Sequence, residues 1–221
     1  MPAALDREPA PDCALCPRLA AFRAENRAKF PDFHNAPVPS FGGLDARLLI
    51  VGLAPGLKGA NRTGRPFTGD YAGDLLYPTL IDYGWARGDY GAAVGDGLKL
   101  TGARITNAVR CVPPANKPEP AEAKTCANFL IAEIAAMKSL QTVLALGALA
   151  HGATLSALGL KKSAYKFGHG AIHRLPNGLV LADSYHCSRY NTNTGVLTTA
   201  MFRAVFDGIA KTVGRPESPP S

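Results

Sequence analysis

The 221-residue sequence has no apolar run that approaches the roughly 20 residues of a membrane-spanning helix. Its beginning, MPAALDREPAPDC, also lacks the apolar core of a secretory signal peptide. No internal repeat is visible. Hydrophobic residues make up 47% of the chain and charged residues 19%, which is typical of a globular protein and excludes a disordered one. We therefore expect a cytoplasmic globular protein with one large domain or two small ones.

The cysteines do not indicate a disulfide framework, because we expect a cytoplasmic protein and thiols stay reduced in the cytoplasm. Cys13 and Cys16 form the motif CALC, Cys111 and Cys126 are separated by fourteen residues, and Cys187 stands alone. The first two pairs could form a four-cysteine site for zinc or for an iron–sulfur cluster. Cys126 could instead be a small buried hydrophobic residue, since it lies among apolar residues on a predicted helix.

Acidic residues are the minority among the charged ones: 24 Lys and Arg face 17 Asp and Glu, for a net charge of +7. A basic surface attracts phosphate, so nucleic acid is a plausible partner. Many basic proteins bind no nucleic acid, however, and the charge alone does not decide the matter.

Four short apolar runs predict strands, at residues 47–54, 104–110, 142–147 and 179–186. Three of them are almost entirely Val, Ile, Leu and Ala, which indicates strands buried on both faces of a parallel sheet. Helical patterns occupy residues 71–84, 121–140 and about 194–213, the last with Thr194 as its expected N-cap. The alternation predicts an α/β layered domain with a mostly parallel sheet.

Ligands of such sheets bind at the carboxyl ends of the strands. The segments 55–70, 111–120 and 186–195 follow predicted strands directly, so we expect them to meet at one edge of the domain. The first of them belongs to the glycine-rich stretch GLAPGLKGANRTGRPFTGD, residues 52–70. It lacks the G-K-[ST] of a phosphate-binding P-loop, which disfavours nucleotide hydrolysis.

Four residues of this loop have two plausible roles each. Phe67 could stack on a base or cover the core. Asp70 could cap a helix that starts at Tyr71 or act as a general base. Arg62 and Arg65 could contact phosphate or simply be solvated.

The segment SYHCSRYNTNTG, residues 184–195, raises the same kind of choice. His186 ends a predicted buried strand, where a histidine can donate a hydrogen bond to a ligand or serve the structure alone. The small polar residues behind it could wrap phosphates, and Tyr190 could be a wedge against bases or an ordinary surface aromatic.

Three separated segments, GLAPG…GANRTGRPFTGD, ITNAVRCVPPANKP and HCSRYNTNTG, resemble the signature segments of the iron–sulfur uracil-DNA glycosylases. The resemblance is greatest to the family 5 (type B) branch, and it runs from about residue 13 to about residue 206. It implies one domain over residues 1–221, a three-layer α/β/α sandwich with a central four-stranded parallel sheet. It also implies an N-terminal cluster-binding segment at about 10–40 and a disordered tail at about 214–221.

The resemblance further implies a monomeric, monofunctional DNA repair enzyme with a [4Fe–4S] cluster on Cys13, Cys16, Cys111 and Cys126. Such an enzyme flips uracil, or also hypoxanthine, xanthine or damaged cytosine, out of DNA and hydrolyses its N-glycosidic bond, which leaves an abasic site. His186 would stabilise the leaving base. The type A branch carries a water-activating acid where this chain has Leu53, so the type B pattern assigns that role to Asp70.

By the same resemblance, the remaining site residues fall into two groups. The base would contact Gly52, Ala54, Phe67, Asn107 and Asn116, and the DNA backbone or groove would contact Arg62, Arg65, Ser188, Arg189, Tyr190 and Asn191. Cys187 replaces the proline that relatives usually carry after the motif-3 histidine, which should loosen that loop.

Two other functions compete with this one. A non-catalytic iron–sulfur or zinc protein that binds damaged or single-stranded DNA would need neither Asp70 nor His186. A small electron carrier fits poorly, because it needs neither the long arginine-containing loop nor a basic surface.

Asn107 generates a first prediction. Many type B enzymes have a small apolar residue at this position, whereas the uracil-specific relatives have asparagine. Its amide offers both a donor and an acceptor to the edge of uracil, and unpaired polar groups discriminate strongly against wrong ligands. We expect faster excision of uracil than of hypoxanthine from matched duplexes; equal rates would contradict this role of Asn107.

Overall fold

The computed structural model describes residues 7–216. Its helices are α1 (Pro17–Lys29), α2 (Ala60–Thr63), α3 (Tyr71–Asp82), α4 (Pro120–Ala136), α5 (Ala148–Ala157), α6 (Arg189–Asn193) and α7 (Thr199–Val213), with short 3-10 turns η1 (Pro114–Asn116) and η2 (Lys162–Ala164). Its strands are β1 (Leu48–Gly52), β2 (Ala86–Arg87), β3 (Lys99–Leu100), β4 (Ala103–Asn107), β5 (Thr142–Leu146), β6 (Ile172–Arg174) and β7 (Val180–Ser184).

The main sheet has five strands in the order β4-β1-β5-β7-β6. Its first four strands are parallel to one another and are the four predicted from the apolar runs. The fifth, β6, pairs antiparallel with β7 at the edge of the sheet. The sheet thus has five strands where four were predicted. The sequence did not reveal β6, because this strand is only the three residues IHR and has no apolar run.

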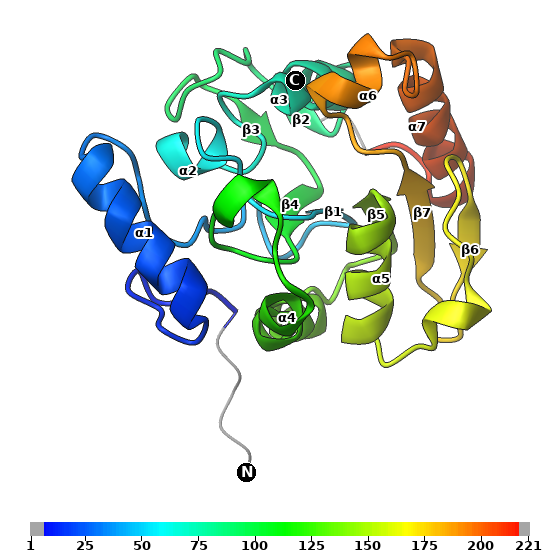
Figure 1. The fold of residues 1–221 in the computed structure, drawn as a ribbon. Coiled ribbons are helices and arrows are strands. Elements are labelled where there is room, and N and C mark those ends of the chain that lie inside the picture. Colours follow the sequence, from blue (N-terminus) through cyan, green and yellow to red (C-terminus); the bar gives the residue numbers. More distant parts are fainter. Residues whose placement is uncertain (1–6, 217–221) are drawn as a thin grey trace.

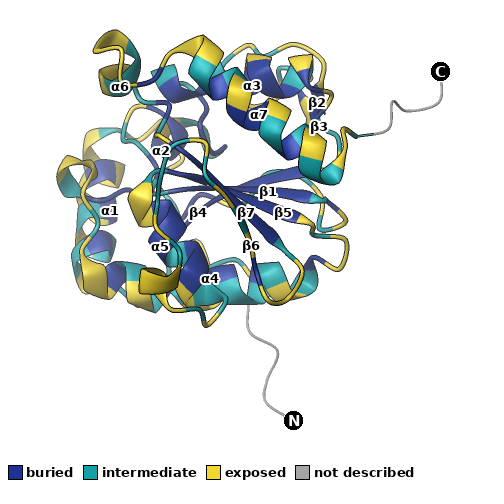
Figure 2. Ribbon diagram, turned by 90° about the vertical axis from the view of Figure 1, so that its right-hand side faces the viewer, coloured by how far each residue is buried: buried dark blue, intermediate teal, exposed yellow. Residues whose placement is uncertain are grey.

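Helices cover both faces of this sheet, as the predicted three layers require (Figures 1 and 2). Side chains alternate along β1, with Leu48 and Ile50 packed on the side of α3 and α7. Leu49 and Val51 point to the opposite face, where α4 and α5 lie. Every residue of β1 is therefore buried, which explains its unbroken apolar sequence.

The C-terminal helix begins later than the sequence predicts. Thr198, not Thr194, is its N-cap and accepts a hydrogen bond from the Met201 backbone N–H at 3.1 Å. Residues 189–193 form the separate helix α6, and Gly195, with a φ of +73°, turns the chain between the two helices. The amphipathic spacing extends across this break, so the pattern alone did not reveal it.

The predicted disordered tail is only partly testable, since residues 217–221 lie outside the described ones. Residues 214–216 pack on the body of the protein: the Arg215 guanidinium lies 4.8 Å from the ring centre of Tyr83. Its carbonyl accepts a hydrogen bond from Arg47. Within residues 7–216, no helix has the length and apolar character needed to cross a bilayer.

A buried ion cluster ties β4 to α4. Glu133 is completely buried and accepts hydrogen bonds from Arg104 at 2.5 Å and from Arg110 at 2.6 Å. Glu8 closes the cluster on its outer side through both arginines. Burial acts to raise the pKa of Glu133, but Arg110, Arg104 and Ser40 outweigh it and hold that pKa below the ordinary 4.5.

We expect Glu133→Gln to lower the free energy of unfolding by about 3 kcal/mol at neutral pH, because it leaves the half-exposed Glu8 as the sole counter-charge that the cluster offers to two buried arginines. The folded pKa of Glu133 is depressed, so its stabilisation is present above 4.5 and is lost as the pH falls through the folded pKa. Urea unfolding across this range measures the effect. Asp82→Asn, which breaks the exposed pair with Arg203, is the control and should cost less than about 1 kcal/mol.

Candidate active site

A cleft of about 690 Å³ lies at the carboxyl edge of the parallel strands. Three loops that are far apart in the sequence form it, as the topology predicts. They are the long loop after β1 with the start of α3 (residues 53–60, 67 and 69–72), the segment after β4 (Asn107 and Asn116), and the segment after β7 (His186, Ser188 and Arg189).

Phe67 forms one wall of the cleft. Its ring is 6% exposed and lies nearly parallel to the His186 ring, with centroids 5.9 Å apart. Its φ is +52°, a left-handed conformation that is unfavourable for a bulky residue by roughly 1–2 kcal/mol. Such strain persists where the surrounding structure imposes it, and it is often found at functional sites.

Gly52 lets the base-binding candidates approach one another. It ends β1 and pairs in register with Asn107 at the end of β4. A Cβ atom at Gly52 would lie 2.4 Å from the Asn107 Oδ1 and 2.5 Å from the Phe67 Cζ, so only glycine fits there. Glycine at this position therefore brings an aromatic ring and an amide together behind the cleft.

Asn107 is 3% exposed, yet its side-chain amide makes no hydrogen bond to another residue within 7–216. It lines the cleft, so donor and acceptor are available to a ligand. Asn116 reaches the same cleft from the η1 turn, where its φ is +56°. Ala54 lines the cleft as well.

Asp70 has one of the two roles that its sequence position left open, that of a helix cap, and it also lines the cleft. It is the N-cap of α3, with Oδ1 accepting a hydrogen bond from the Ala72 backbone N–H at 3.2 Å. Its second carboxylate oxygen faces the loop after β1, since a Cβ at Gly59 would lie 2.3 Å from Oδ2. Burial raises the pKa of Asp70 above 3.8, although hydrogen bonds from the Gly73 and Ala72 backbone oppose the shift.

His186 follows β7 and lines the cleft. The Asn191 amide donates a hydrogen bond to the His186 carbonyl at 2.8 Å, which fixes the backbone that carries the imidazole. Burial lowers the pKa of His186 below 6.5, so the imidazole is neutral at pH 7. Burial disfavours the charged form of both groups, so it raises the pKa of Asp70 and lowers that of His186.

The structure corrects the expected role of Arg65. Its guanidinium is buried and forms a bidentate ion pair with Asp96, at 2.8 and 2.6 Å, so it has no free face for a phosphate. Sequence could not show this, because Asp96 lies thirty-one residues away in an unremarkable loop. Arg62 is exposed and does not line the cleft.

The other predicted DNA-contacting residues lie at or near the rim of the cleft. Ser188 and Arg189 line it, and the Arg189 guanidinium lies 5.7 Å from the centre of the Tyr71 ring. Tyr190 is 73% exposed. Cys187 is completely buried, and its side chain packs in the core that includes Phe67.

The uracil-DNA glycosylase superfamily model matches residues 39–210, which include all of the strands and the whole cleft. The chain belongs to the uracil-DNA glycosylase superfamily. It is 47% identical to the type-5 uracil-DNA glycosylase of Thermus thermophilus over 198 residues, which cover 87% of this chain and 90% of that relative. It is 40% identical to the Mycobacterium tuberculosis type-5 enzyme over 210 residues, which cover 91% of this chain and 78% of the relative.

Relatives of the type-4 branch match a shorter part of this chain. The type-4 uracil-DNA glycosylase of Thermotoga maritima is 38% identical over 110 residues, which cover 49% of each chain. The similarity to type-5 proteins thus spans most of the sequence, as the resemblance to the type B branch predicts.

The four cysteines of the predicted cluster line a second, small cavity of the protein, beside α1 and α4. Metal-binding groups need several His, Cys, Asp or Glu ligand atoms close together. Within residues 7–216, only one group has three or more such atoms within 4.8 Å of one another, and it contains no cysteine. Zn–S bonds of about 2.3 Å bring tetrahedral thiolates within about 4 Å, so these sulfurs are too far apart for one zinc ion. Thiolates that bind different irons of one cluster stand farther apart than those on a single zinc ion.

Two donors also face this cavity. The Arg23 guanidinium lies 3.9 Å from the Cys111 Sγ, and the Arg110 backbone N–H lies 3.4 Å from the Cys126 Sγ. Hydrogen bonds to sulfur are a normal feature around iron–sulfur clusters. The donor set therefore fits a cluster.

The group that does meet the 4.8 Å spacing is His151, His173 and Asp183, which the sequence analysis missed. The imidazoles hydrogen-bond to different oxygens of the buried Asp183 carboxylate, at 2.8 and 3.2 Å. None of the three lines the cleft. In the sequence, His173 lies in FGHGAIH and Asp183 in LADSYH. Nothing in these letters shows that the two residues are neighbours until β6 and β7 are known to pair.

The raised pKa of Asp70 predicts that this carboxylate opposes folding at neutral pH. The native state binds its proton more tightly than the unfolded chain, so stability falls as the pH rises through the folded pKa. Asparagine caps helices as well as aspartate does. We expect Asp70→Asn to raise the thermal midpoint at neutral pH, with a gain that shrinks toward pH 3.8. A lower midpoint at neutral pH would contradict the argument.

Proposed function

We propose that the protein is a DNA repair glycosylase that removes uracil from DNA by hydrolysing its N-glycosidic bond. The main support is the cleft, in which a partly buried carboxylate, a neutral histidine, an aromatic wall and an unpaired amide face one space. Type-5 uracil-DNA glycosylases that match most of this chain are the second support.

The base must leave the duplex before it can enter such a cleft. Phe67 stacks on the flipped uracil, and the Asn107 amide pairs with its polar edge. Asn116 and the backbone at Ala54 complete the pocket. A larger deaminated purine, such as hypoxanthine or xanthine, presents a different edge to Asn107 and is a poorer substrate.

Bond cleavage separates charge. As the bond between the sugar C1′ and the uracil N1 breaks, its electron pair stays on the base and positive charge develops on the sugar. The neutral imidazole of His186 donates a hydrogen bond to the uracil oxygen that carries the negative charge. Asp70 stabilises the cationic sugar and orients a water molecule, whose oxygen bonds to C1′ and whose proton passes to the carboxylate. Asp70 then releases its proton to solvent and the uracil anion takes one up, so the products are free uracil and an abasic site.

The DNA on either side of the flipped nucleotide contacts the rim of the cleft. Ser188 and Arg189 lie at this rim, with Tyr190 beside them, and Arg62 adds a positive charge nearby. We infer a monomer with one domain over the whole chain. A non-catalytic DNA-binding protein would need neither Asp70 nor His186 in the cleft.

We further propose that Cys13, Cys16, Cys111 and Cys126 hold a [4Fe–4S] cluster. Leu19 of α1 and Phe129 of α4 form the small core beside these cysteines. A cluster here would join the N-terminal segment to the segment after β4, which carries Asn116. It supplies a covalent link and no step of the reaction.

Asp70→Asn tests the function directly. We expect wild-type protein to release uracil from a duplex containing one uracil, and the variant to be slower by about 10²–10⁴-fold in single-turnover assays. Because burial raises the pKa of Asp70, the acid limb of the wild-type profile should lie above 3.8 and disappear in the variant.

Asp82→Asn is the matched control, because Asp82 is exposed at the other end of α3 and does not line the cleft. It should keep wild-type activity. A wild-type protein that binds the duplex without releasing uracil would overturn the proposal and favour the non-catalytic function.

Metal analysis tests the cluster. We expect about four iron atoms and four sulfides per chain after anaerobic purification, as a four-cysteine cluster requires. Cys111→Ser should lose most of this iron. Cys187→Ser is the control and should keep it, since Cys187 lies in the main core. About one zinc per chain, with no sulfide, would contradict the cluster.

A further inference from the structure

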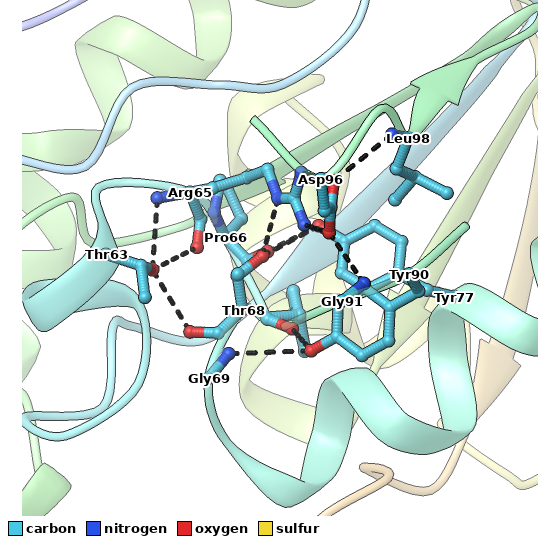
Figure 3. Close-up of polar contacts among 11 residues, drawn as sticks. Thr63, Arg65, Pro66, Thr68, Gly69, Tyr77, Tyr90, Gly91, Asp96 and Leu98 are labelled. Carbon is cyan, nitrogen blue, oxygen red and sulfur yellow. Dashed lines mark hydrogen bonds and ion pairs between the residues drawn. The ribbon is translucent and has the colours of Figure 1, made fainter. Parts of the chain in front are cut away.

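Arg65 sits inside an enclosure that we call the arginine cage: Arg65, Tyr77, Tyr90 and Asp96 (Figure 3). Both terminal nitrogens of the guanidinium bond to Asp96, and its carbon lies 5.4 and 5.9 Å from the ring centres of Tyr77 and Tyr90. The two tyrosine rings stack on each other at 4.6 Å. Asp96 is itself held by the backbone N–H groups of Gly91 and Leu98.

The cage is directed at the backbone of residues 66–69 (Figure 3). The Tyr77 hydroxyl donates to the Pro66 carbonyl at 2.6 Å. The Tyr90 hydroxyl donates to the Phe67 carbonyl at 3.3 Å and accepts from the Gly69 N–H at 3.4 Å. Arg65 Nε donates to the Thr68 hydroxyl at 2.8 Å. Each residue of this turn thus has a partner in the cage.

This turn carries two residues of the cleft. Phe67 has its unfavourable φ of +52° in the middle of it, and Asp70 follows Gly69 directly. A strained residue keeps its conformation only when neighbouring contacts fix it. The Phe67 carbonyl is fixed by Tyr90, and Gly73 leaves room for that contact, since a Cβ there would lie 2.0 Å from the carbonyl oxygen.

We propose that the arginine cage is a positioning device that fixes the Phe67 ring and the Asp70 carboxylate relative to each other in the cleft. Neither Tyr90 nor Asp96 lines the cleft, so both act only through the turn. The kinetic part of this inference rests on the proposed glycosylase function. Arg65, which the sequence predicted as a phosphate contact, then helps to fix the two residues that contact the base and the sugar.

The cage holds this geometry over a wide pH range. Arg65 holds the pKa of Asp96 well below its ordinary value of 3.8, so the ion pair survives mild acid. Burial raises the pKa of Tyr90 to about 12, so its hydroxyl keeps the proton that it donates to Phe67.

Tyr90→Phe removes one hydroxyl and keeps the ring. We expect its single-turnover rate on uracil-containing duplex to fall by about tenfold to a hundredfold, because small misplacements of reacting groups have effects of that size. Its uracil-to-hypoxanthine rate ratio should also fall, since the wall formed by Phe67 becomes less fixed. A purely structural role would not change that ratio.

Tyr83→Phe is the matched control. It also removes a hydroxyl from a mostly buried tyrosine, but that hydroxyl bonds to Asp207 and to the Arg203 carbonyl on α7, away from the cleft. We expect it to lower the thermal midpoint by a similar amount and to keep both the rate and the ratio. Equal kinetic losses in the two variants would overturn the positioning role.

Amide hydrogen exchange on free protein makes the test independent of catalysis. We expect faster exchange across residues 66–72 in Tyr90→Phe and unchanged exchange there in Tyr83→Phe. Unchanged exchange in both would overturn the cage even if the enzyme is active. Faster exchange in Tyr90→Phe beside a wild-type protein that releases no uracil would support the cage and overturn only the proposed function.

Discussion

Parallel pairing of β1 with both β4 and β5 is the constraint on which the rest of this protein depends. Parallel neighbours cannot be joined by a tight hairpin, so each strand leaves the sheet and returns by a crossover on one face. All of the carboxyl ends then lie on the same edge. The loops after β1, β4 and β7 must meet there, and residues as distant in sequence as Asp70 and His186 come to line one cleft.

Buried arginines change what the net charge means. The +7 of the composition suggests a basic surface, but Arg23, Arg65, Arg104 and Arg110 are each less than 9% exposed. Arg104 and Arg110 share Glu133, and Arg65 pairs with Asp96. The last three order the interior, because each buried guanidinium is matched by a carboxylate in a defined geometry. Part of the positive charge thus shapes the site and does not steer DNA toward it.

The cleft combines features that oppose stability locally. Phe67 adopts a left-handed backbone conformation, and Asp70 is a carboxylate whose pKa burial raises. The Asn107 amide opens into the cleft, where a ligand can hydrogen-bond to it. The surrounding sheet and the ion clusters stabilise the fold that keeps these groups in place.

The sequence by itself determined the four parallel strands, the edge at which their loops meet, and the family, because long apolar runs and three extended motifs are local signals. It left Asp70 between the roles of helix cap and general base, and the structure shows it as the cap, with its carboxylate in the cleft. Only the tertiary structure decided the ion pair of Arg65 with Asp96, the existence of β6 and the start of α7 at Thr199. These features depend on partners distant in sequence or on a break that the apolar spacing conceals, and no local pattern encodes which distant side chain closes a contact.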